Sequence, residues 1–162
     1  MGTDVKVAIV GGAGHVGLPM GIVLADAGFS VKLIDKNKER LATIKDGELP
    51  FSEPGGEPIL NEVLANGRLD TTTDIETTTD CDIVFFVIGT PIDEHHNPQM
   101  ETLFDVVEDV IDTLGDGELL VFRSTIYPGT TDIVCEMLGN KGYSVGKDVF
   151  VSFAPERIAQ HR

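Results

Sequence analysis

The feature that most limits what this chain can fold into is a glycine-rich run, Gly-Ala-Gly-His-Val-Gly, at residues 12–17. The run follows Val-Lys-Val-Ala-Ile-Val at residues 5–10, a short segment rich in β-branched residues that predicts a buried strand. From Gly14 to Ala27 apolar residues recur at helical spacing, and Gly28 supplies a natural stop. A glycine turn between a strand and a helix is the context in which this pattern binds a diphosphate.

Each glycine of this turn has its own expected role. Gly12 permits the tight turn, Gly14 lets the backbone approach a pyrophosphate, and Gly17 lets the helix pack against the strand. The pyrophosphate is then expected to rest on free N–H groups at the positive end of the helix. His15 and Val16 complete the predicted cofactor-binding turn, and the alternative interpretation of His15 is a surface side chain of the first helical turn.

Asp35 provides a second, independent signal, because it closes another predicted strand that starts at Ser30. It follows the turn at close to the roughly 20 residues expected for an acid that hydrogen-bonds the adenine ribose hydroxyls. A carboxylate there would repel a 2′-phosphate, so the predicted cofactor is NAD and not NADP, although Lys36 and Lys38 oppose that preference. The plain alternative is a glycine-rich turn followed by an ordinary surface aspartate.

Predicted strands and helices alternate along the rest of the chain. The expected strands are residues 69–73, 82–88, 119–124 and 149–153, and the expected helices are residues 37–46, 59–65, 102–114 and 130–138, with loops at 47–58 and 89–100. This alternation predicts an α/β fold with a doubly wound, mostly parallel sheet and helices on both faces, which is Rossmann-like. We expect residues 1–162 to form a single NAD-binding domain. Since no cap or turn closes residues 155–162, we expect it to be truncated before further domains.

The composition excludes several classes of partner. Lys and Arg number 12 against 27 Asp and Glu, for a formal charge of −15, and such a surface repels phosphate backbones and anionic lipids. We therefore expect no nucleic-acid partner and no membrane. No apolar run reaches the roughly 18 residues of a membrane span, and no leader precedes the first strand, which predicts a cytoplasmic protein.

Metal and disulfide chemistry are also not expected. Cys81 and Cys135 show neither CxxC nor Cys/His spacing, and we interpret both as small buried side chains. His95, His96 and His161 are interpreted as solvent-facing loop residues without metal-ligand spacing.

Five short segments, in order, resemble those of one enzyme family. They are Gly-His-Val-Gly-Leu-Pro at 14–19, Glu-Pro-Gly at 53–55, Gly-Thr-Pro at 89–91, Ser-Thr at 124–125 followed by Pro-Gly-Thr-Thr at 128–131, and Ala-Pro-Glu-Arg at 154–157. Together they resemble the GxVGLP, EPG, TP, ST-x-x-PGT and PER segments of the UDP-glucose/GDP-mannose dehydrogenase family. The resemblance is greatest to its UDP-N-acetylmannosamine or UDP-N-acetylglucosamine branch, because Arg157 stands where the UDP-glucose branch has an aromatic residue. Gln160 departs from the pattern, since relatives often carry a Glu there.

The resemblance implies roles for three further residues. Thr90 and Thr125 follow predicted strands, where open α/β sheets place ligand-contacting residues. In the family, the residue matching Thr125 lies beside the nicotinamide and helps to place a catalytic water, and the residue matching Glu156 serves acid–base chemistry. The alternatives are a Thr-Pro turn at Thr90, a strand-end cap at Thr125 and a helix-start acid at Glu156.

The resemblance also implies an activity, the oxidation of a nucleotide-sugar alcohol to the uronic acid in two NAD-dependent steps. The family's nucleophilic cysteine lies in downstream domains, so we expect this chain to bind NAD(H) without turning over sugar. The full-length protein is expected to form a homo-oligomer through the missing central region, and this piece is compatible with a monomer. Two alternatives stay open: a free-standing module that senses NAD(H), and another two-domain dehydrogenase for hydroxyacyl or phosphogluconate substrates.

The acidic residues are spread along the chain, which predicts a solvated acidic shell of the kind used in high-salt cytoplasm, where salt screens self-repulsion. We expect the free energy of unfolding to fall as KCl is removed. Urea unfolding across a KCl series checks this, with an osmotically matched sucrose series as control. A stability indifferent to KCl would contradict the prediction.

Overall fold

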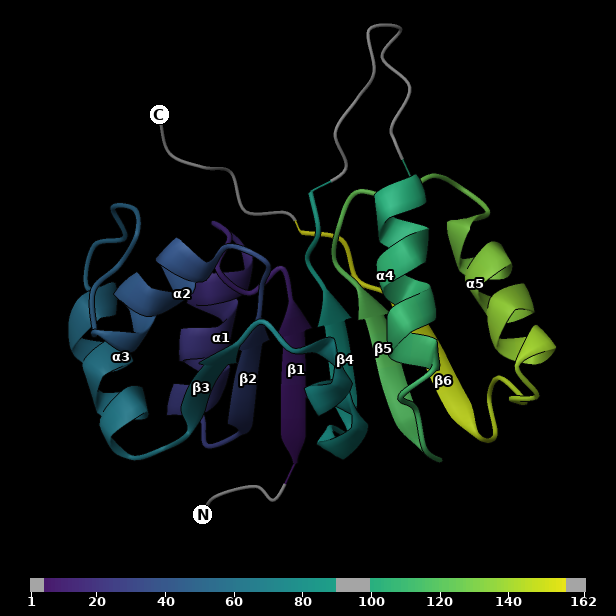
Figure 1. Cartoon of the computed structure of the whole chain (residues 1–162), viewed down its shortest axis with the longest axis horizontal. Helices are drawn as coiled ribbons and strands as arrows, with labels where there is room; N and C mark the ends of the chain where they lie inside the picture. The colour runs from purple at the N-terminus through teal and green to yellow at the C-terminus, as the bar shows by residue number, and fades with distance from the viewer. Residues whose placement is uncertain (1–4, 90–99, 157–162) are drawn as a thin grey trace, which may run out of the picture.

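The computed structural model describes residues 5–89 and 100–156, in which one parallel sheet runs through the whole domain. Its strands are β1 (Lys6–Val10), β2 (Ser30–Ile34), β3 (Leu69–Thr72), β4 (Ile83–Phe86), β5 (Glu118–Phe122) and β6 (Val149–Phe153). They pair in parallel in the order β3-β2-β1-β4-β5-β6 (Figure 1). The predicted doubly wound α/β fold is therefore confirmed.

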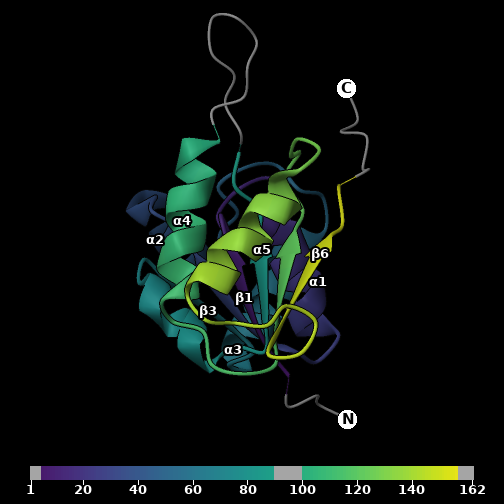
Figure 2. The same cartoon turned by 90° about the vertical axis from the view of Figure 1, so that its right-hand side faces the viewer.

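Helices cover both faces of this sheet. They are α1 (Gly17–Asp26), α2 (Lys38–Lys45), α3 (Gly56–Ala65), the short 3₁₀ helix η1 (Ile75–Asp80), α4 (Glu101–Ile111) and α5 (Thr130–Asn140). Figure 2 shows α1 and α4 on opposite sides of the strands. Right-handed crossovers produce this arrangement, because the chain moves one way along the sheet from β1 to β3 and the other way from β4 to β6.

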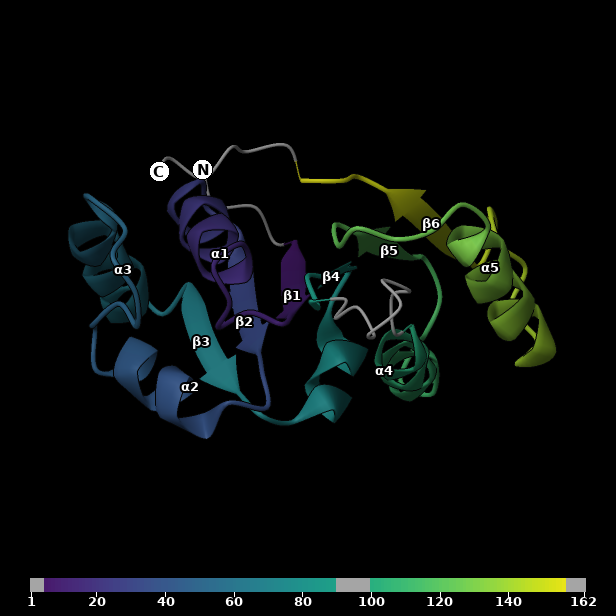
Figure 3. The ribbon, with the colours of Figure 1, turned by 90° about the horizontal axis from the view of Figure 1, so that it is seen from above.

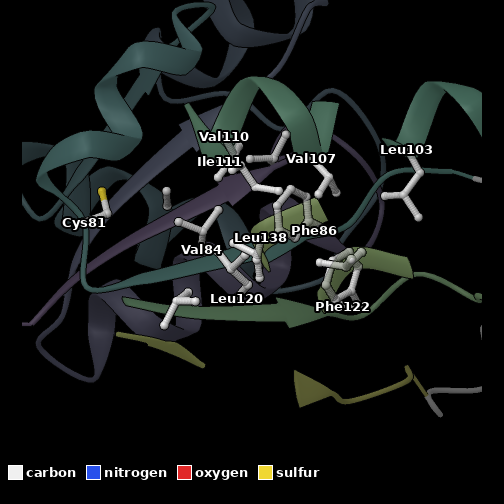
Figure 4. Close-up of a cluster of buried hydrophobic side chains, with 14 of the residues drawn as sticks. Cys81, Val84, Phe86, Leu103, Val107, Val110, Ile111, Leu120, Phe122 and Leu138 are labelled. Carbon is white, nitrogen blue, oxygen red and sulfur yellow. The ribbon is translucent and has the colours of Figure 1, made fainter. Parts of the chain in front are cut away.

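The strands are short and apolar because both faces of the sheet are buried. One core cluster joins alternate residues of β1 and β2 to α1, α2 and α3, and includes Ile9, Leu18 and Leu33. The other joins β4 and β5 to α4 and α5, and is shown in Figure 4. At its centre the rings of Phe86 and Phe122 stack with centroids 4.8 Å apart and planes 10° from parallel.

The structure corrects several predicted boundaries. The first helix begins at Gly17 and not at Gly14, since residues 14–16 form a turn. α3 begins at Gly56 instead of residue 59, because Pro58 stands in the first turn, where its missing N–H is not needed. The 3₁₀ helix η1 was not predicted, because Ile75–Asp80 carries little apolar periodicity. β4 ends at Phe86, two residues short of the prediction.

The predictions for the two cysteines are partly confirmed. Cys81 is buried, but Cys135 is only half-buried, and both are free thiols. Within the described ranges, no helix is long and apolar enough to cross a membrane. The predictions at six positions lie outside the described residues: Thr90, His95, His96, Arg157, Gln160 and His161.

Candidate functional site

The candidate site lies at the edge of the sheet where all six strands end, at the point where the strand order reverses between β1 and β4. Figure 3 views this edge, with the turn before α1 beside the ends of β1 and β4. Ligands of open α/β sheets bind outside the carboxyl ends of the strands at such a switch point, because the loops there diverge to opposite faces.

The glycines of the turn are required by close backbone packing. A Cβ on Gly17 would lie 2.5 Å from the carbonyl oxygen of Gly11, and one on Gly12 would lie 2.8 Å from that of Ile9. Gly11 has a φ of +86°, and a Cβ there would meet the Val87 carbonyl oxygen at 2.5 Å. The expected packing role of Gly17 thus has a direct steric cause. Gly11 is a third glycine required by packing, and the spacing pattern did not single it out, whereas a Cβ on Gly14 would lie 3.3 Å from the Gly11 carbonyl oxygen and is not excluded by packing.

The turn leaves backbone N–H groups available. The amide of Gly14 donates to the Gly11 carbonyl (3.2 Å), whereas no bond within the described ranges is recorded for the amides of His15 and Val16. Val16 caps α1 without a side-chain hydrogen bond. In the first turn of α1 the Leu18 amide donates to the Gly14 carbonyl oxygen at 3.0 Å and Pro19 has no N–H, so within the described ranges Gly17 is the helical residue there whose amide has no acceptor. Unpaired amides at a helix start form a site for an anion such as a diphosphate.

Asp35 follows β2 immediately and is bound to the glycine turn. Its Oδ2 accepts a hydrogen bond from the Ala13 amide at 3.0 Å, and its Oδ1 accepts one from the Asn37 amide at 2.9 Å. Each carboxylate oxygen can accept a second bond, so the group keeps capacity for ribose hydroxyls. Asp35 therefore does two things at once: it holds the turn in place and presents acceptor oxygens to the edge of the sheet.

A cavity of about 590 Å³ opens beside these groups. Gly11, Gly14 and Asp35 line it together with apolar residues of the neighbouring elements: Val10, Ile34, Ile75, Val87, Ile88 and Val106. This volume is in the range of pockets that hold small ligands, and apolar walls with a few polar groups are typical of them. The glycine turn, the carboxylate and the cavity together fit the phosphates and ribose of a dinucleotide.

His15 is exposed and precedes α1, so it is neither in the first helical turn nor buried. Its ring packs on Phe51 with centroids 4.1 Å apart. Phe51 lies in the loop just before Glu53, and this loop was predicted to matter only because of its Glu-Pro-Gly segment. The contact attaches this loop to the glycine turn, and neither local sequence predicts it.

The other half of the edge carries Thr125 and Glu156. Thr125 is exposed, three residues past the end of β5. Its neighbour Ser124 is buried and donates to the carbonyl oxygen of Ile88 at 2.6 Å, which joins the end of β5 to the segment after β4. The Ser124 hydrogen bond therefore places Thr125 next to Ile88, which also lines the cavity.

Glu156 is half-buried and forms an ion pair with Arg123, a residue that the sequence analysis did not single out. The Glu156 amide also donates to the Arg123 carbonyl oxygen at 3.4 Å. Arg123 Nε is buried and has no hydrogen-bond partner among the described residues, so the guanidinium is held mainly through its other end. Its position directly before the Ser-Thr segment was the one feature of the sequence from which a role for Arg123 could have been predicted.

Nucleophilic or metal chemistry finds little support in the described ranges. Burial raises the pKa of the Cys81 thiol, and burial together with Asp132 raises that of Cys135, so neither is an activated thiolate. No group of three potential metal ligands was found among the described residues.

Comparison with known proteins gives a consistent picture. The UDP-glucose/GDP-mannose dehydrogenase family, NAD binding domain, matches residues 5–162. The chain is 31% identical over 158 residues to the UDP-N-acetyl-D-mannosamine dehydrogenase of Pyrococcus horikoshii, covering 97% of this chain and 37% of that protein. It is 31% identical over 159 residues to the UDP-N-acetyl-D-glucosamine 6-dehydrogenase of Salmonella typhi, covering 96% and 36%.

Among solved structures, the UDP-D-ManNAc dehydrogenase of Pyrococcus horikoshii matches with a TM-score of 0.89 at 31% identity. The match covers 95% of this chain and 37% of that one. The chain thus spans little more than a third of the length of these relatives.

Gly17→Ala tests the packing of the turn, since the added methyl must displace the Gly11 backbone. We expect a destabilisation of about 1–3 kcal/mol in urea unfolding, and NAD binding weakened by about 1–3 kcal/mol in calorimetric titration through lost amide contacts. Gly139→Ala in α5 is the matched control, because its Cβ meets nothing within 4 Å, and it should stabilise slightly. Equal behaviour of the two variants would contradict the packing argument.

Proposed function

Since this chain belongs to the UDP-glucose/GDP-mannose dehydrogenase family, we propose that it forms the NAD-binding part of a nucleotide-sugar 6-dehydrogenase that oxidises a UDP-N-acetylhexosamine. UDP-N-acetylmannosamine is the favoured substrate. Relatives named for UDP-N-acetyl-D-mannosamine and UDP-N-acetyl-D-glucosamine support this choice, as does the Pro-Glu-Arg segment of the sequence. The reaction would belong to a longer polypeptide and would yield the uronic acid in two oxidations.

One observation carries the coenzyme assignment: the amides of residues 15–16, which have no acceptor in the described part of the chain, the carboxylate of Asp35 and an apolar cavity share one edge of the sheet. The amides and the start of α1 would hold the diphosphate, with Gly12, Gly14 and Gly17 keeping side chains out of its way. Asp35 would accept from the adenine ribose hydroxyls. When bound, NAD supplies the hydride acceptor, and the domain supplies its orientation.

The chemistry is proposed for the neighbouring part of the edge. Thr125 would lie beside the nicotinamide and hydrogen-bond a water there, and Thr90 would contact the cofactor. Glu156 would exchange a proton with substrate or water. Arg123 forms an ion pair with Glu156 and so holds its carboxylate at this edge of the sheet. An ion pair at this position has no obvious use in a module that only senses NAD(H), which favours the enzyme over that alternative.

Several properties of the whole protein are part of the proposal. We place it in the cytoplasm, as a homo-oligomer without nucleic-acid or membrane partners, in the biosynthesis of a polysaccharide. The charge of −15 supports the exclusion of polyanionic partners and also a halophilic source.

The coenzyme assignment is tested by titrating the chain with NAD and NADP in a calorimeter. NAD should bind, NADP should bind more weakly, and Asp35→Ala should weaken NAD by roughly 1–3 kcal/mol because ribose hydroxyls lose their acceptor. Asp26→Ala is the matched control, since Asp26 is exposed and ends α1 at the opposite edge of the sheet. No affinity for NAD at millimolar concentration would overturn the proposal.

Arg123→Gln tests how Glu156 is held, in the full-length enzyme with its nucleotide sugar. We expect kcat to fall by about tenfold to a hundredfold, as for a misplaced catalytic group. The KM for NAD should stay unchanged, and Arg123→Lys should restore part of kcat. If kcat were unaffected in Arg123→Gln, Glu156 would not depend on this ion pair.

A further inference from the structure

One wall of the cavity is not part of the glycine fingerprint. It is formed by α4, which contributes Thr102, Val106 and Asp109. These residues are spaced by four and then three positions, so they form a single stripe on one side of the helix. The stripe places a hydroxyl, an apolar side chain and a carboxylate along the cavity, in that order.

Asp109 stands at the margin of the cavity that is remote from the glycine turn. Asp109 and Ile75 also line a second, neighbouring cavity of about 480 Å³, to which neither the glycines nor Asp35 contribute. The main cavity therefore runs from the turn, past Asp35, to a boundary formed by η1 and α4. A ligand whose phosphates lie at the turn and whose ribose lies at Asp35 places its base toward this boundary.

The two walls at this boundary are fixed relative to each other. The Thr78 and Thr113 hydroxyls, on η1 and after α4, lie 2.6 Å apart in a hydrogen bond. The Thr78 hydroxyl also lies 2.8 Å from the carbonyl oxygen of Ile75, and that of Thr113 lies 2.7 Å from that of Val110. Thr78 is buried, so this bridge is shielded from water. The spacing between Ile75 and the α4 stripe is thus set before a ligand arrives, which lowers the entropic cost of binding.

The chemistry of this end suits an adenine. The apolar side chains of Ile75, Ile88 and Val106 offer contact to the faces of a flat ring. An ionised carboxylate only accepts hydrogen bonds, and the 6-amino group is the strongest donor on adenine. Hypoxanthine carries a carbonyl oxygen in place of that amino group, and a carboxylate repels it. Thr73 and Thr102 do not discriminate between the two, because a hydroxyl both donates and accepts.

We propose that Asp109 selects the adenine base of the dinucleotide, by accepting a hydrogen bond from its 6-amino group and disfavouring bases with an oxygen there. The inference rests on the proposed function, since it presupposes that the cavity binds NAD. It assigns α4 the recognition of the base, whereas the glycine turn is assigned the diphosphate and Asp35 the adenine ribose.

The experiment compares NAD with nicotinamide hypoxanthine dinucleotide by calorimetric titration of the whole chain. The unaltered protein should bind NAD about tenfold more tightly, as expected when a matched base-edge contact is replaced by a mismatched one. Asp109→Asn should bring the two affinities close together, because an amide accepts from the amino group and donates to the carbonyl oxygen. Asp109 is exposed, and thermal unfolding should show that the variant folds as the parent does.

Glu108→Gln is the matched control, because it removes the same charge from the adjacent, exposed position of α4, which does not line the cavity. It should leave the preference for NAD intact, whereas a loss equal to that of Asp109→Asn would reduce the effect to general charge and overturn the proposal. Equal binding of both dinucleotides by the unaltered protein would overturn it while leaving the proposed function standing. If neither dinucleotide binds, the proposed function fails and the inference fails with it.

Discussion

The structure depends on a stretch of bare backbone that packs against itself between β1 and α1. Gly17 contacts the Gly11 carbonyl so closely that no side chain fits, and Gly12 packs as closely on Ile9 and Leu33. α1 starts at Gly17, and within the described ranges the amides of His15 and Val16, which precede it, have no acceptor. The Asp35 carboxylate, bonded to the Ala13 amide, fixes this turn to the end of β2. The packing requirement thus shapes the turn that we propose as the diphosphate site.

The sheet register brings the second half of the site to the same edge. Phe86 pairs with Phe122, and Phe122 with Phe153, so the residues that follow these strands emerge side by side. The hydrogen bond from Ser124 to the Ile88 carbonyl oxygen joins the segments after β4 and β5, and the ion pair of Arg123 with Glu156 joins the segment after β6 to them. Thr125 and Glu156 are therefore placed close to the ends of β5 and β6, and rigid elements help to position reacting groups.

In the proposed binding mode, two parts of the cavity wall divide the recognition of the dinucleotide. The glycine turn and Asp35 are proposed to bind the diphosphate and the adenine ribose, while α4, which lines the same cavity, is proposed to contact the base. This proposed division explains why the fingerprint of residues 12–35 predicts a dinucleotide as the class of ligand but does not identify its base. The family relationship supports the proposed class of enzyme, and the residues that line the cavity add what the fingerprint does not encode.

The sequence by itself determined the alternation of strands and helices, the parallel sheet, the glycine turn and the position of Asp35. Each of these follows from local physics: hydrophobic periodicity, the steric freedom of glycine and short-range spacing along the chain. Only the tertiary structure decided that α1 starts at Gly17, that Arg123 pairs with Glu156, that His15 packs on Phe51 and that α4 closes the cavity. These contacts join residues far apart in the chain, and their partners are selected by strand register and crossover direction, which no local pattern contains.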